Sequence, residues 1–137
     1  MRAQFSKSVL WVGTIVLAFG LVTAVGQQSP PRENKGITTP KTIAMDLGPE
    51  IDGMQGRQLR LRVIKADPGG VIGLHSHKDR PTVLYVIQGN LTEYYEGGAV
   101  KEYREGDAWT KGKDATHWAE NKGATPVVFV GADVLKP

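Results

Sequence analysis

Hydrophobic and polar residues alternate over short stretches of this chain, a pattern typical of β-strands. In the sequence LRLRVI, residues 59–64, leucine and valine alternate with arginine, as on a strand with one buried face. Residues 82–87 form a β-branched and aromatic run that is closed by Gly89. From residue 41 onward no stripe of apolar residues follows the period of a helix. The main part of the chain is therefore predicted to be all-β.

Turn signals divide the remaining sequence into further short strands. Residues 91–95 and 99–103 flank the pair Gly97-Gly98, a strong signal for a two-residue hairpin. Strands are also expected over residues 115–119 and 127–130. Short strands at regular spacing indicate a sandwich or barrel. A length of 137 residues leaves room for one such domain.

The N-terminal segment has a different pattern. Residues 9–26 carry no charge and follow Arg2 and Lys7, which describes a secretory signal. Small residues at the end of this run favour cleavage before Gln27, whereas its length of 18 residues also approaches that of an uncleaved membrane anchor. Residues 1–26 are thus predicted to be a signal peptide or an N-terminal anchor. Both alternatives place the domain in the periplasm or outside the cell.

Prolines mark the next boundary. Pro30, Pro31 and Pro40 give residues 27–40 the composition of a flexible linker. The β-domain is therefore predicted to span residues 41–137. A membrane is an expected partner only through the apolar N-terminal run, and only if that run is uncleaved.

Composition excludes several classes of site and partner. The net charge of +3 includes Arg2 and Lys7, so residues 27–137 hold 15 basic and 14 acidic side chains, without a basic cluster for nucleic acid. The chain has no cysteine, which excludes disulfides, thiolate zinc sites and iron–sulfur clusters. Any metal must therefore be bound by histidine or by oxygen ligands.

The three histidines of the chain all fall in the β-rich part. His75 and His77 are two positions apart, so on a strand both rings project from the same face. Two such imidazoles make half of a site for Zn, Cu, Fe or Ni. The alternative is a pair of exposed histidines on a loop after Gly73. The residues around the pair favour the metal site.

Glycines and histidines recur at a fixed spacing that resembles the two motifs of the cupin superfamily. The matching positions are Gly69, His75, His77 and Gly89 in the first motif, and Gly106, His117 and Asn121 in the second. The resemblance covers residues 42–134. It implies a small single-domain jelly-roll β-barrel in which His75, His77 and His117 bind one divalent transition metal: Fe, Zn, Cu, Ni or Mn.

One departure from the cupin pattern changes the expected metal site. The family's glutamate ligand should stand at position 82, which is Thr82 in this chain. A hydroxyl is a poor ligand for a divalent cation, so three histidines remain and the other positions are left to water or substrate. The loss of a negative ligand raises the net charge of the centre, which favours an anionic co-ligand. In the second motif, Gly112 and Asp114 replace the usual proline and glycine and affect turn shape.

Alternation along the strand at residues 82–87 predicts a pocket. Thr82, Leu84, Val86 and Gln88 fall on one face, which would give a largely apolar cavity with one amide near its rim, suited to a small ligand. Arg80, on the preceding loop, has two interpretations: it steers an anionic ligand toward the metal, or, as we expect, it is a solvated charge. The acidic residues on or beside the hairpin are expected at the surface: Glu93, Glu96, Glu102 and Glu105.

Three functions fit these features. The first is a metal-dependent dioxygenase or related oxidoreductase that acts on a small organic substrate through the three-histidine site. The second is a non-catalytic barrel that binds a small ligand or metal, because no acid or base is expected on the inner face. The third is a structural domain with a vestigial site. A homodimer is expected because exposed strand edges of small barrels often pair.

Overall fold

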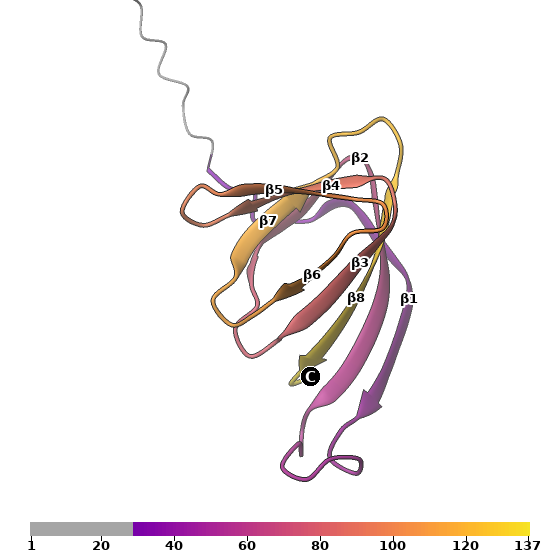
Figure 1. Cartoon of the computed structure of the whole chain (residues 1–137), viewed down its shortest axis with the longest axis vertical. Coiled ribbons are helices and arrows are strands. Elements are labelled where there is room, and N and C mark those ends of the chain that lie inside the picture. Colours follow the sequence, from indigo (N-terminus) through magenta and orange to yellow (C-terminus); the bar gives the residue numbers. More distant parts are fainter. Residues whose placement is uncertain (1–28) are drawn as a thin grey trace, which may run out of the picture.

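The computed structural model describes residues 29–137, and these residues form an all-β barrel that is nearly closed (Figure 1). The predicted signal or anchor, residues 1–26, lies outside the described residues. The described part contains no helix of the length and apolar character needed to cross a membrane. Its eight strands are β1 (Lys35–Asp46), β2 (Gln58–Ser76), β3 (Thr82–Gln88), β4 (Asn90–Tyr95), β5 (Val100–Arg104), β6 (Ala108–Lys111), β7 (Thr116–Glu120) and β8 (Val127–Leu135).

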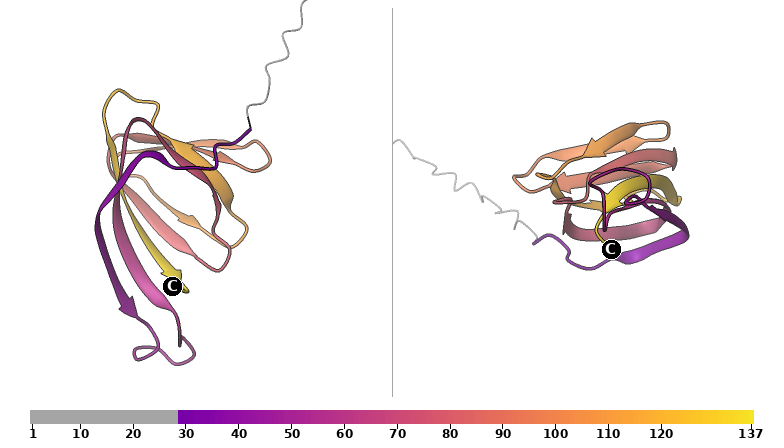
Figure 2. Two further views of the ribbon diagram at one scale, coloured as in Figure 1. Left: turned by 180° about the vertical axis from the view of Figure 1, so that it is seen from behind. Right: turned by 90° about the horizontal axis from the view of Figure 1, so that it is seen from below.

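The strands form one antiparallel sheet that curls over itself. The strand order is β5-β4-β7-β2-β8-β3-β6, and β1 pairs with the remaining edge of β2. Figure 1 shows β4, β5 and β7 lying across one end of the other strands, and the views in Figure 2 agree. The predicted all-β jelly-roll barrel is thereby confirmed.

β2 connects the two parts of the sheet because it is 19 residues long. Its first part, residues 58–66, pairs with β8, and its second part, residues 71–76, pairs with β7. Between these parts Gly69 adopts a φ of +71°, a conformation that favours glycine. The strand can therefore leave one neighbour and join the next without ending.

The core lies between the two parts of the sheet. Period-2 alternation turns every second residue inward, as along β3, where Leu84 and Val86 are buried while their neighbours are exposed. The buried apolar side chains of this core cluster are Ile64, Ala66, Leu84, Val86, Leu91, Ala119, Val127 and Phe129. Their burial is the main favourable contribution to folding, at about 25 cal/mol for each Å² removed from water.

The strands predicted from alternation are present, including the hairpin of β4 and β5. Gly97 and Gly98 take φ values of +91° and +92° in its turn, as the sequence signal requires. The predicted linker needs correction because β1 already begins at Lys35. β1 is exposed along almost its whole length, and it contains Gly36 and Pro40, residues that argue against a strand.

Residues before β1 also belong to the domain. The carbonyl oxygen of Pro31 accepts a hydrogen bond of 2.7 Å from the backbone N–H of Leu74. The side chain of Asn34 accepts another, of 2.9 Å, from the N–H of Gly73. The segment predicted as a linker thus packs beside the part of β2 that carries the histidines. The homodimer expected from exposed strand edges stays a prediction.

Gly89→Ala should destabilise the domain more than Gly97→Ala. Both glycines have positive φ, which costs an alanine about 1–2 kcal/mol. At Gly89 the new Cβ would also lie 3.0 Å from the oxygen of Pro126, whereas at Gly97 it would meet no atom within 4 Å. Urea unfolding of both variants measures the difference. Equal losses of unfolding free energy would show that the close approach at Gly89 is unimportant.

Candidate metal centre

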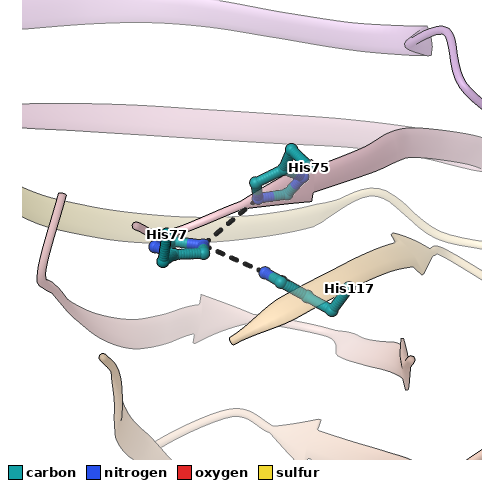
Figure 3. Close-up of side chains that lie close together, drawn as sticks. All are labelled: His75, His77 and His117. Atoms are coloured by element: carbon teal, nitrogen blue, oxygen red, sulfur yellow. Dashed lines mark hydrogen bonds between the residues drawn. The ribbon is translucent and has the colours of Figure 1, made fainter. Parts of the chain in front are cut away.

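The three histidines converge inside the barrel (Figure 3). His75 lies near the end of β2, His77 follows one residue after that end, and His117 lies on β7. The pairing of β2 with β7 places His75 directly opposite His117. The Nε2 atoms of His75 and His77 are 3.2 Å apart, and those of His77 and His117 are 3.1 Å apart. The predicted ligands are therefore brought together.

These separations fit one metal ion. With metal–nitrogen bonds of about 2.0–2.1 Å, two ligand nitrogens lie about 2.9 Å apart in a right-angled arrangement and about 3.4 Å apart in a tetrahedral one. The observed values of 3.1 and 3.2 Å fall between these limits. The ligand nitrogens of all three residues lie within 4.8 Å of one another.

The outer ring nitrogens of His75 and His77 fix which nitrogen faces the centre. Nδ1 of His75 lies 2.8 Å from the carbonyl oxygen of Gly73. Since a carbonyl only accepts, Nδ1 carries the proton and Nε2 presents its lone pair. Nδ1 of His77 lies 2.9 Å from Oγ1 of Thr82. Thr82 donates its own proton to the carbonyl oxygen of Arg80, at 3.0 Å, so it accepts from His77.

His117 also carries its proton on Nδ1 and its lone pair on Nε2, but the contact that favours this tautomer is different. Its Nδ1 is buried without a hydrogen-bond partner among the described residues and lies 3.7 Å from Oε1 of Glu93. This separation is too long for a hydrogen bond, but the nearby negative charge favours a proton on Nδ1. All three Nε2 lone pairs then point to one position. Lone pairs this close repel one another unless a cation lies between them.

Burial keeps the three imidazoles neutral, the form that binds metals. Burial, and then the charge of Arg80, lowers the pKa of His77 to about 4. Burial, and then the charge of Lys111, lowers the pKa of His117 to about 2. The pKa of His75 is lowered as well, chiefly by burial. At neutral pH protons therefore do not compete for the Nε2 atoms.

Glu93 requires a correction, because it was expected at the surface and is only 1% exposed. Its carboxylate forms an ion pair with Lys111, which is equally buried, and accepts a hydrogen bond of 2.7 Å from the hydroxyl of Tyr95. The ring of Tyr95 lies 5.5 Å from that of His117. A carboxylate is buried only when its charge is compensated. The partner stands 18 residues away, and no sequence signal linked the two.

A cavity of about 310 Å³ adjoins the histidines. Of the residues predicted to line a pocket, Thr82 and Leu84 do so. Val86 instead packs in the core, and Gln88 is exposed. The pairing of β3 with β8 shifts register between Val86 and Gln88, which interrupts the alternation on which the prediction depended.

Arginines line the cavity as well; the sequence offered Arg80 as a guide for an anionic ligand but gave no signal for Arg62 and Arg32. Arg80, expected as a solvated loop charge, is 26% exposed, and its Nη1 lies 3.9 Å from Oδ2 of Asp133. Arg62 projects from β2 on the same inward face as Ile64, and Arg32 comes from the segment before β1. The apolar part of the lining is Ile37, Ile64, Ile72, Leu74, Leu84, Leu91 and Phe129.

Solved structures with the same fold include proteins described as oxalate decarboxylases. A predicted oxalate decarboxylase from Thermotoga maritima is 25% identical, with a TM-score of 0.50, over 55% of this chain and 64% of its own. An oxalate decarboxylase variant from Bacillus subtilis is 21% identical, with a TM-score of 0.52, over 79% of this chain and 28% of its own, and it shows the fold alone.

A further structural match is an uncharacterized protein with a double-stranded β-helix domain from Klebsiella pneumoniae. It is 27% identical, with a TM-score of 0.53, over 57% of this chain and 68% of its own. No curated protein matches the sequence. The sequence model of the family described as Cupin domain matches residues 62–133, more than half of the 137 residues. The chain therefore belongs to the cupin family.

Proposed function

We propose that this protein is an exported, metal-dependent cupin oxidoreductase of the dioxygenase type that acts on a small organic substrate. One observation carries the proposal: three imidazole lone pairs converge beside an open cavity of about 310 Å³. Export is inferred from the pattern of residues 1–26. A structural neighbour described as a predicted oxalate decarboxylase supports small-molecule chemistry in this barrel.

The chain's own residues hold and orient the proposed centre. His75, His77 and His117 would bind the ion through Nε2. A bound divalent metal would supply Lewis acidity and, if it were iron or copper, electron transfer with O₂. Thr82 occupies the position of the family's carboxylate ligand, yet its hydroxyl accepts from Nδ1 of His77. Thr82 would therefore orient His77 and would not bind the ion itself.

The cavity limits which molecules can reach the centre. Its volume lies at the lower end of the range for small-molecule sites, about 300–1,000 Å³. Leu84, Leu91 and Phe129 form apolar walls that would contact the non-polar part of a substrate and exclude water. A compact substrate with both apolar and polar groups fits such a lining.

A non-catalytic binding barrel is the second candidate, and one observation favours it. Among the described residues that line the cavity, Glu93 is the single acidic group, and its charge is already paired with Lys111. No free carboxylate therefore faces a substrate as a general base. Steady consumption of a ligand by the metal-loaded protein would reject this alternative.

The purified protein, without a histidine tag, should contain about one transition-metal ion per chain. The double variant His75→Ala/His77→Ala should contain none, because it keeps a single imidazole of the three. Elemental mass spectrometry measures both contents. A wild-type content no higher than that of the variant, even after incubation with metal, would contradict the three-histidine centre.

Thr82→Val should weaken metal binding by about 10–100-fold, as the loss of a group that orients a metal-binding histidine typically does. Valine keeps the shape of threonine but removes the acceptor for Nδ1 of His77. Thr92→Val is the matched control, since Thr92 is equally buried but does not line the cavity. Competition with a chelator measures both affinities. Equal affinities in the two variants would contradict an orienting role.

The metal-free protein should lose stability as the solution is acidified. The pKa of His77 is about 4 in the folded protein against 6.5 in the unfolded chain, so the unfolded chain takes up this proton first. The contribution to stability is fully present above about pH 6.5 and is lost as the pH falls toward about 4. The free energy of unfolding, measured with urea near neutrality and at about pH 5, should fall less for His77→Gln than for the wild type. An equal fall in unfolding free energy for both proteins would contradict the role of His77 in this pH dependence.

A further inference from the structure

Three arginines surround one buried carboxylate at the side of the cavity. Asp133, on β8, is 1% exposed. Arg60 donates to both of its oxygens, from Nε at 3.0 Å and from Nη2 at 2.8 Å. Nη2 of Arg62 lies 3.2 Å from Oδ2 and Nη1 of Arg80 lies 3.9 Å from it. One negative charge is thus shared among three positive ones.

The strand register explains why the arginines differ in position. Arg60 pairs directly opposite Asp133, whereas Arg62, two residues further along β2, pairs opposite Gly131. Gly131 has no side chain to fill the space in front of Arg62. Arg62, Gly131 and Arg80 line the cavity, and Arg60 does not.

Arg62 is not needed to satisfy Asp133. Arg60 alone already donates a hydrogen bond to each carboxylate oxygen. Nε of Arg62 is buried and has no hydrogen-bond partner among the described residues. A buried donor without a partner is unfavourable. Burial, followed by the charge of Arg60, lowers the pKa of Arg62, as expected where positive charge is in excess.

The rest of the cavity supplies no compensating negative charge. Arg32 adds a third cation to the lining, and the single acidic residue among the described lining residues, Glu93, is paired with Lys111. Arg80 lines the same cavity as His75, His77 and His117, so its positive charge adds to that of the proposed centre. Three neutral imidazoles would likewise leave the charge of a divalent ion uncompensated.

We propose that Arg62 and Arg80 form an anion-binding subsite of the cavity. The substrate of the proposed function is then a small carboxylate whose anionic group contacts these two guanidiniums while its other oxygen donors face the histidines. A guanidinium binds carboxylates through charge-assisted hydrogen bonds of defined direction. This inference rests on the proposed metal centre and specifies the class of molecule that the centre meets.

Calorimetric titration of the full-length, metal-loaded protein with malonate tests the subsite, with malonamide as the uncharged analogue. The wild type should bind malonate and fail to bind malonamide. Arg62→Gln should weaken malonate binding about tenfold or more. Arg60→Gln is the matched control: it alters the same Asp133 cluster outside the cavity, and its affinity should stay within about threefold of the wild type.

Metal content, measured on every sample, separates this inference from the proposed function. A wild type without metal would contradict the metal centre itself. A fully loaded wild type that does not bind malonate, or equal losses in the variants Arg62→Gln and Arg60→Gln, would overturn the subsite and leave the metal centre intact. If Arg62→Gln does not fold, Arg80→Gln replaces it, and unchanged affinity in that variant would also overturn the subsite.

Discussion

The pairing of β2 with two neighbours in succession determines where the site residues of β2 lie. The first part of β2 pairs with β8 and positions Arg60 and Arg62 against Asp133, and the second part pairs with β7 and positions His75 opposite His117. Because successive side chains of a strand face opposite sides, a slip of one residue in either register would turn these groups out of the barrel. The hydrophobic core favours the register of β2 with β8, since a slip there would also expose Ile64 and Ala66.

Inside the barrel, a row of paired polar residues lies next to the apolar core. One inward row runs across four strands, from Arg60 to Asp133, Thr82 and Lys111, each paired opposite the next. The following row, which includes Leu84, is largely apolar. Buried charges of this kind seldom add stability in comparison with apolar residues of similar size.

Much of the metal centre could be predicted from local sequence, whereas most of the cavity could not. The spacing of His75 and His77 and the glycine motifs are properties of adjacent residues. Glu93 and its partner Lys111 meet only through tertiary structure, and the irregular pairing that displaces Gln88 depends on β8. β1 was missed because Gly36 and Pro40 lie within it, and both residues argue against a strand. Arg62 was visible as the polar side of a predicted strand, but that side proved to face inward.

The continuity of β2 has a consequence for selectivity. β2 carries both Arg62 and His75, and His77 directly follows its last residue. Their separation is set by the course of β2, which turns at Gly69 between its two pairings, and all residues between Arg62 and His75 belong to that strand. Such an arrangement fixes the distance between the arginine and the histidines. If the proposed subsite and the proposed centre bind the same molecule, the length between its charged end and its donor atoms must match this separation.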